Sequence, residues 1–214
     1  MHKITLVCSV HREKGLCNAE ELLKILRAIE PEAIFVEWRP SEWDFYYKLG
    51  NVDAHAIARY REYKLFQTVP VDRYDMPQNL LAEMRDFEAW MIQTSQEFQE
   101  LMERENDSVQ QEGFKHLSSA AFARISARMS EVEEETVNRT GDQRLISWLG
   151  RLRHLMQGRE SEMVGKIYEY CRENVFDIGV FLVGAAHKTA IVKEIERYAG
   201  AEADLIAWKL DYDV

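Results

Sequence analysis

Two histidines, His11 and His187, follow short apolar runs at opposite ends of the chain. Small residues precede each histidine, and an amphipathic helix pattern and a second apolar run come after it. This order predicts two βαβ units. Open α/β sheets bind ligands at the carboxyl ends of their parallel strands. If both units belong to one sheet, the two imidazoles should share a site built from opposite ends of the chain.

Three further segments place charged side chains where this site is expected. Glu37 lies near the end of an apolar strand, where a carboxylate is costly unless it is paired or faces the crevice. Asp72 and Arg73 follow a third strand-like run. Arg159 is expected to open a helix, from which a guanidinium can bind a carboxylate or stabilise an oxyanion. The alternatives are a solvated Glu37, a turn or structural ion pair at Asp72 and Arg73, and a surface Arg159.

The strands and helices that would position these residues follow from the apolar patterns. Asn18, with Glu21 three residues later, is typical of the start of a helix, and Pro31 ends it. Pro70 indicates an edge position or an irregular end for the third strand. A buried strand is expected at 3–9, further strands at 33–38, 66–72, 178–184 and 204–209, and helices at 55–63, 160–174 and 189–198, with Gly200 as the residue that ends the last helix.

The middle of the chain differs from both ends. It is rich in Glu, Gln, Met and Arg, and it favours amphipathic helices broken near 106–107 and 138–141. The fold class expected is α/β: a central, mostly parallel sheet built from two strand-His-helix-strand halves, with a large α-helical insertion. The domains expected are a first half at 1–76, the insertion at 77–158 and, completing the same sheet, a second half at 159–214. The insertion could cap the site or serve as a homodimer arm.

Composition excludes several classes of protein. The 214 residues carry a formal net charge of −10, which argues against nucleic-acid binding and against docking on an anionic membrane. Three cysteines in no metal-binding spacing, and no apolar leader or spanning segment, predict a cytoplasmic protein. Phosphate-binding loops, dinucleotide-binding glycine motifs, zincin helices and the serine-hydrolase elbow are all missing.

The ordered polar residues resemble the TraB/PrgY/Tiki group, within a superfamily that includes erythromycin esterases and ChaN-like proteins. The stretch 184–187 matches the group's second G-x-x-H motif. The stretch 8–11 matches the first, except that Cys8 stands where glycine is usual. Segments 35–38, 71–75 and 159–163 are similar to the strand with the family glutamate, the Asp-Arg segment and the arginine-containing helix start.

The resemblance implies a hydrolase-like site: a metal-dependent peptidase or an esterase acting on a small-molecule or peptide substrate. His11, Glu37 and His187 would hold a divalent metal (Mn, Co or Zn) or activate water directly. Arg159 would stabilise negative charge, Asp72 would orient a histidine or the water, and Arg73 would pair within the site. The alternatives are a non-catalytic module that binds a small molecule, haem or a peptide, and an interaction protein that dimerises through its helical middle.

Overall fold

The computed structural model describes residues 1–72, 77 and 79–211. Its sheet confirms the expected α/β class: in these ranges five strands, all parallel, lie in the order β3-β2-β4-β1-β5. Their bounds are β1 (His2–Ser9), β2 (Ala33–Val36), β3 (Gln67–Pro70), β4 (Ile178–Gly184) and β5 (Ile206–Lys209). β3 is an edge strand, as Pro70 predicts.

The two ends of the chain share the middle of this sheet. β1 pairs with the whole of β4 from Lys3 onward, and the last residue of β1, Ser9, lies opposite the last residue of β4, Gly184. β4 separates β1 from β2, and β1 separates β4 from β5. The two halves are therefore interleaved, and the connections that leave β1 and β4 run in opposite directions across the sheet.

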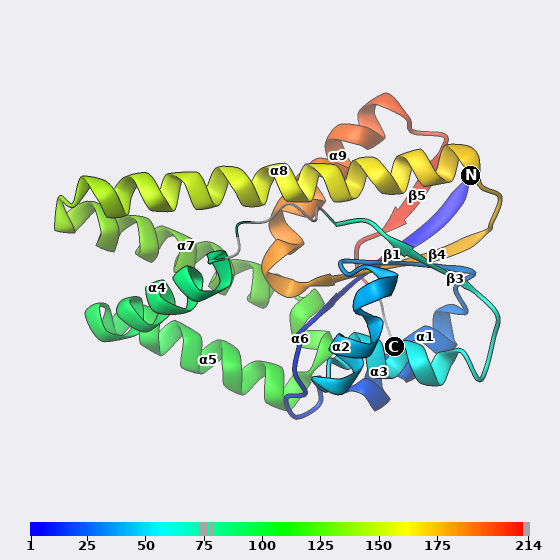
Figure 1. Cartoon of the computed structure of the whole chain (residues 1–214), viewed down its shortest axis with the longest axis horizontal. Coiled ribbons are helices and arrows are strands. Elements are labelled where there is room, and N and C mark those ends of the chain that lie inside the picture. Colours follow the sequence, from blue (N-terminus) through cyan, green and yellow to red (C-terminus); the bar gives the residue numbers. More distant parts are fainter. Residues whose placement is uncertain (73–76, 78, 212–214) are drawn as a thin grey trace.

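Helices cover both faces of the sheet, because each βαβ connection must return over it. α1 (Ala19–Ile29) and α3 (Val52–Tyr60) pack together on one face, and α9 (Lys188–Ala201) packs with α8 (Gln143–Glu173) on the other (Figure 1). The core between these layers is apolar and includes fully buried Leu22, Phe35, Phe181 and Tyr168. The short helices η1 (Pro40–Glu42) and α2 (Trp43–Lys48) follow β2, and η2 (Ala185–His187) follows β4.

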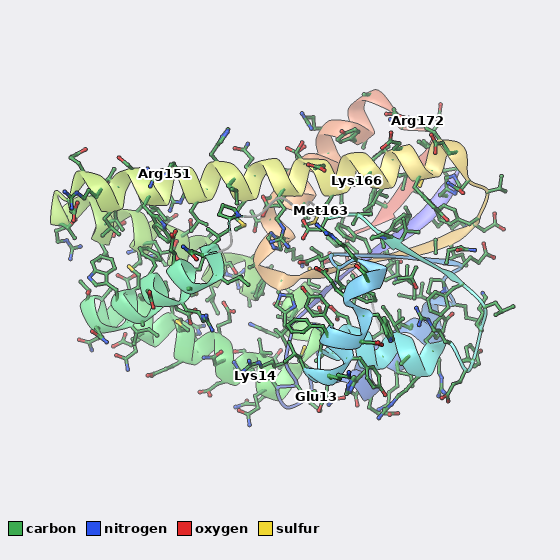
Figure 2. The ribbon with its side chains drawn as sticks, viewed as in Figure 1. Glu13, Lys14, Arg151, Met163, Lys166 and Arg172 are labelled. Atoms are coloured by element: carbon green, nitrogen blue, oxygen red, sulfur yellow. The ribbon has the colours of Figure 1, made fainter. Side chains whose placement is uncertain are left out.

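The helical insertion extends to one side of the sheet, on the left of Figure 1. It comprises α4 (Leu80–Thr94), α5 (Gln96–Glu112), α6 (Phe114–Ser118), α7 (Ala120–Thr140) and the first half of α8. A small core of its own contains Met91, Phe98 and Val132. In Figure 2, Arg151 lies on the part of α8 that belongs to this arm, whereas Met163 and Lys166 lie on the part nearer the sheet.

Several local predictions are confirmed. Asn18 caps α1 by accepting a hydrogen bond from the Glu21 amide at 3.0 Å. α7 ends at Gly141, which has a positive φ of 68°, and the strand expected at 178–184 is β4. In the described part of the chain, no helix combines the length and the apolar character needed to cross a bilayer.

Other local predictions are wrong. Arg159 does not open a helix, because α8 runs without interruption through Gly158 and across the boundary expected between residues 158 and 159. α5 runs through 106–107 without a break, and Gly200 lies inside α9 rather than after it. Single glycines and Asn-Asp pairs weaken a helix by amounts that packing can exceed, so they do not fix its ends.

The loop that carries His11 is held against the arm at two glycines. Gly15 has a φ of 54°, and a Cβ atom there would lie 2.1 Å from the Gln110 carbonyl oxygen. Gly113 has a φ of 58°, and a Cβ atom there would lie 2.5 Å from the Leu16 carbonyl oxygen. The Leu16 amide donates to the Gln110 carbonyl at 2.9 Å. The position of the His11 loop therefore depends on backbone contact with the end of α5.

Replacing Gly15 with alanine tests this contact. The new Cβ would overlap a carbonyl oxygen, so we expect G15A to lower the free energy of unfolding by about 3 kcal/mol or more. Gly141 also has a positive φ but open space around it, so G141A should cost only about 1 kcal/mol. Denaturant unfolding of both variants measures the difference. Equal losses would show that the contact does not constrain the loop.

Candidate functional site

The candidate site lies where β1 and β4 end side by side. Their connections leave in opposite directions across the sheet, and open α/β sheets bind ligands at such a point. His11 follows the end of β1 by two residues, and His187 follows the end of β4 by three. The topology thus brings the two histidines to one place although they are far apart in sequence.

Gly184, the last residue of β4, brings His11 and Glu37 together. Its amide N–H donates a hydrogen bond to Glu37 Oε1. A Cβ atom at this position would lie 3.4 Å from Glu37 Oε1 and 3.5 Å from His11 Nε2. The His11 ring is exposed, whereas the Glu37 side chain is only 11% exposed. An imidazole open to solvent therefore lies beside a carboxylate that the backbone holds in place.

Arg159 connects the other charged residues. Its Nε and Nη2 atoms donate to the two Asp72 carboxylate oxygens at 2.7 and 2.6 Å, a bidentate pair. Nη2 also donates to Glu37 Oε2 at 3.1 Å, and Nη1 lies 3.3 Å from His187 Nε2. Its side chain is 16% exposed, so solvent screens these contacts weakly. The neighbouring acids, Asp72 first, raise the pKa of Arg159 against the lowering effect of its burial.

His187 is fixed at both ring nitrogens. Nδ1 lies 2.8 Å from Glu160 Oε1, and Nε2 faces Arg159. A proton on Nδ1 satisfies both contacts, since that nitrogen then donates to the carboxylate and Nε2 accepts from the guanidinium. Glu160 was missed from the sequence. Its only signal is its place next to Arg159, on a helix segment that was expected to enter the site.

Asp53 was also missed, because a carboxylate in the first turn of a helix is ordinarily solvated. α3 starts behind Asn51, which caps it, and carries Asp53 into the interior, where the side chain is 5% exposed. Ser9 donates to Asp53 Oδ2 at 2.9 Å, whereas Oδ1 has no hydrogen-bond partner among the described residues. Burial raises the pKa of Asp53 to about 6, against the opposing effects of His11 and the Ser9 hydrogen bond.

The geometry brings five of the six expected site residues into one neighbourhood: His11, Glu37, Asp72, Arg159 and His187. The sixth, Arg73, lies outside the described residues. Asp72 binds Arg159 through both carboxylate oxygens, where it had been expected to orient a histidine or water. Cys8 is buried, and burial raises the pKa of its thiol to about 12, so it is a poor nucleophile at neutral pH.

The arrangement does not fit a metal held by His11, Glu37 and His187. The Arg159 guanidinium contacts Glu37 Oε2 and His187 Nε2, and a divalent cation would need the same lone pairs. The other nitrogen of His187 is taken by Glu160. Within the described ranges, no three His, Cys, Asp or Glu side chains gather as metal ligands do. Metal binding stays a prediction that direct measurement must test.

The chain matches no protein-family model, no curated protein and no solved structure. The resemblance to the TraB group therefore stays a prediction. Any assignment of function depends on the side chains described above.

Asp53→Asn tests the buried carboxyl group. A carboxyl with a raised pKa binds its proton more tightly in the folded state, so it stabilises the fold at low pH and this contribution is lost as pH rises through about 6. Asparagine can keep the Ser9 hydrogen bond without the charge. We expect D53N to be more stable than the wild type by on the order of 2 kcal/mol at pH 8 and by much less at pH 4.5.

Chemical unfolding at several pH values measures this difference. Asp204→Asn, at an exposed aspartate, is the matched control and should show no such pH dependence. A D53N effect that is constant with pH would mean that the carboxyl of Asp53 titrates as it does in the unfolded chain.

Proposed function

We propose that the protein is a hydrolase that activates water without a metal, with His11 as the general base and Arg159 as the group that stabilises developing negative charge. One observation carries the proposal. The exposed imidazole of His11 lies at the same carboxyl edge of the sheet as the partly buried guanidinium of Arg159, which Asp72 and Glu37 hold in place. Acyl transfer to water requires these parts: the imidazole takes a proton from the attacking water, the guanidinium stabilises the oxyanion, and the imidazolium returns the proton to the leaving alkoxide or amine as the tetrahedral intermediate collapses.

The two histidines differ in their freedom to act as a base. His187 already uses both nitrogens, one with Glu160 and one with Arg159. Among the described residues no hydrogen bond fixes the His11 ring, and its exposure admits water and substrate. His11 is therefore the base, and His187 helps to hold the guanidinium.

Arg159 keeps one donor for the substrate. A guanidinium has five N–H bonds, and the contacts to Asp72, Glu37 and His187 account for four of them. The remaining bond, on Nη1, can donate to an oxyanion. Because the other four are fixed, little reorganisation is needed when charge develops, which is the property that makes such donors effective in catalysis.

The carboxylates act by holding these groups. Asp72 fixes the plane of the guanidinium, and the Lys166 ammonium donates to the Asp72 carbonyl oxygen at 2.8 Å. Glu37 links the guanidinium to the Gly184 amide, next to His11. Esters and peptides are the substrates that this site would hydrolyse, in line with the resemblance to the TraB group.

A non-catalytic binding module, for a small molecule, haem or a peptide, is the second candidate. The Arg159 guanidinium favours this candidate as well. Four of its N–H bonds are held by the protein, so the fifth is in a fixed position to bind one acceptor atom of a ligand. Turnover distinguishes the two functions, since only the hydrolase releases product.

We also propose a cytoplasmic location and a homodimer formed through the helical arm. Cys8, Cys17 and Cys171 are free and buried, which fits a reducing compartment. The arm extends beyond the sheet and offers surface for a second copy (Figure 1).

His11→Ala is the main test of the hydrolase. We expect it to lower kcat about 100-fold or more on ester or peptide library substrates that the wild type cleaves, because general-base catalysis is lost. Since His11 is exposed, the fold should persist. His154→Ala, at an exposed histidine of the arm, is the matched control and should retain full activity.

Metal is tested in the same assay by elemental analysis, by chelation, and by adding Mn, Co or Zn. Activity that survives chelation supports direct water activation; activity restored only by metal supports the metal-dependent version. Unchanged hydrolysis in H11A would remove His11 as the base, and a wild type that cleaves neither library would favour the binding module.

A further inference from the structure

A pocket of about 380 Å³ lies beside the cluster formed by His11, Glu37, Asp72, Arg159 and His187, and it takes no part in the proposed hydrolysis. It is lined by Trp38, Ser41, Trp43, Asp44, Arg61 and Thr68, from the segment after β2, from α2, from the end of α3 and from β3. Its volume is in the range of pockets that bind small ligands. Trp38 directly follows Glu37, so the pocket and the cluster share a short stretch of chain.

Trp38 presents a buried donor without an acceptor. Its side chain is 5% exposed, and its indole Nε1 has no hydrogen-bond partner among the described residues. A buried N–H without an acceptor costs free energy, so such groups are rare unless a ligand or water satisfies them. Trp38 also lines the pocket, so a small rotation of its side chain would let an acceptor oxygen of a ligand supply the missing bond.

Arg61 adds a positive charge that is engaged by a ring and a hydroxyl and by no ion pair among the described residues. Its guanidinium carbon lies 4.2 Å from the centroid of the Trp43 ring, and Nη2 makes a long 3.4 Å contact with Thr68 Oγ1. Stacking on a ring uses the face of a guanidinium and leaves its N–H edge free to donate. In the part of the chain that the structure describes, no carboxylate pairs with Arg61.

Asp44 brings the opposite charge to the same pocket. It is exposed, and it forms no ion pair with Arg61 although both line the cavity. A ligand that places an acceptor near Arg61 and a donor near Asp44 satisfies both. A phosphate dianion would be repelled by Asp44, whereas a carboxylate with an N–H group next to it matches the pair of charges.

We propose that this pocket binds an α-amino carboxylate unit, with the carboxylate at Arg61 and the Trp38 indole N–H and the amino or amide N–H at Asp44. A free amino acid and the carboxyl-terminal residue of a peptide share this chemistry. The pocket volume accommodates one such residue.

Binding of this ligand does not depend on the proposed hydrolysis. Its role as part of a substrate rests on the proposed function, because the pocket would then hold the terminal residue of a peptide whose cleaved bond lies near His11 and Arg159. Tyr46 lies between the pocket and the charged residues of the proposed active site. Its ring centroid is 6.3 Å from that of Trp38, and the charges of Glu37, Asp72 and Arg159 act on its hydroxyl.

The experiment measures binding to the whole chain by calorimetry and by the indole N–H signals of ¹⁵N-labelled protein, with Trp38→Phe used to assign the Trp38 signal. The probes are L-phenylalanine, N-acetyl-L-phenylalanine and N-acetyl-L-phenylalanine amide. We expect both carboxylates to bind and to shift the Trp38 indole signal, and the amide to bind at least about tenfold more weakly.

Variants assign the contacts. Arg61→Gln should weaken binding of both carboxylates at least about tenfold. Arg59→Gln is the matched control: Arg59 pairs with Glu20 at 2.8 Å outside the pocket, and its loss should leave binding unchanged. Asp44→Asn distinguishes the two sources of the ligand. If the ligand is a free amino acid, D44N should weaken the binding of L-phenylalanine severalfold more than that of N-acetyl-L-phenylalanine. If the ligand is the carboxyl-terminal residue of a peptide, D44N should weaken the binding of both probes equally.

Equal affinity for acid and amide in the wild-type protein would overturn the inference, whatever the variants do. So would an unshifted Trp38 signal, or binding that R61Q retains. His11→Ala separates this result from the proposed function, because it should abolish hydrolysis while leaving binding intact in the pocket, which His11 does not line.

Discussion

The partly buried Arg159 guanidinium is the interaction on which the site depends. It joins helix α8 to the ends of β2 and β3 through Glu37 and Asp72, and it faces His187 after β4. A charge in such a position is tolerated only when most of its donors find acceptors, and removing one partner of a buried pair is far more costly than losing a surface pair. This one side chain therefore fixes the position of α8 relative to the ends of β2 and β3.

The sheet topology explains why this arrangement is possible. Interleaving places β1 and β4 side by side, and their connections leave in opposite directions, so the space between their carboxyl ends is the point at which open α/β sheets bind ligands. Residues 11 and 187 reach that space because Ser9 and Gly184 pair in register. The backbone amide of Gly184 then completes the binding of Glu37.

Much of this could be predicted from the sequence, because buried parallel strands have a strong apolar signal and their carboxyl ends lie at one edge. The strand at 178–184, the cap at Asn18 and the shared location of His11 and His187 follow from such local patterns. The partners could not be predicted in the same way. Glu160 and Asp53 look like ordinary solvated helix residues, and only packing against the sheet buries them. The role of Asp72 as a partner of Arg159 depends on a helix register that no local pattern fixes.

The continuity of α8 has a mechanical consequence. Its 31 residues form a rod of about 46 Å, and Arg159 lies near its midpoint, with the arm on one side and the sheet on the other. A rod of this kind transmits rotation, so the arm cannot tilt without displacing the guanidinium. If two orientations of the arm differ in their affinity for a ligand at the site, then by linkage that ligand shifts the arm between them by the same free energy.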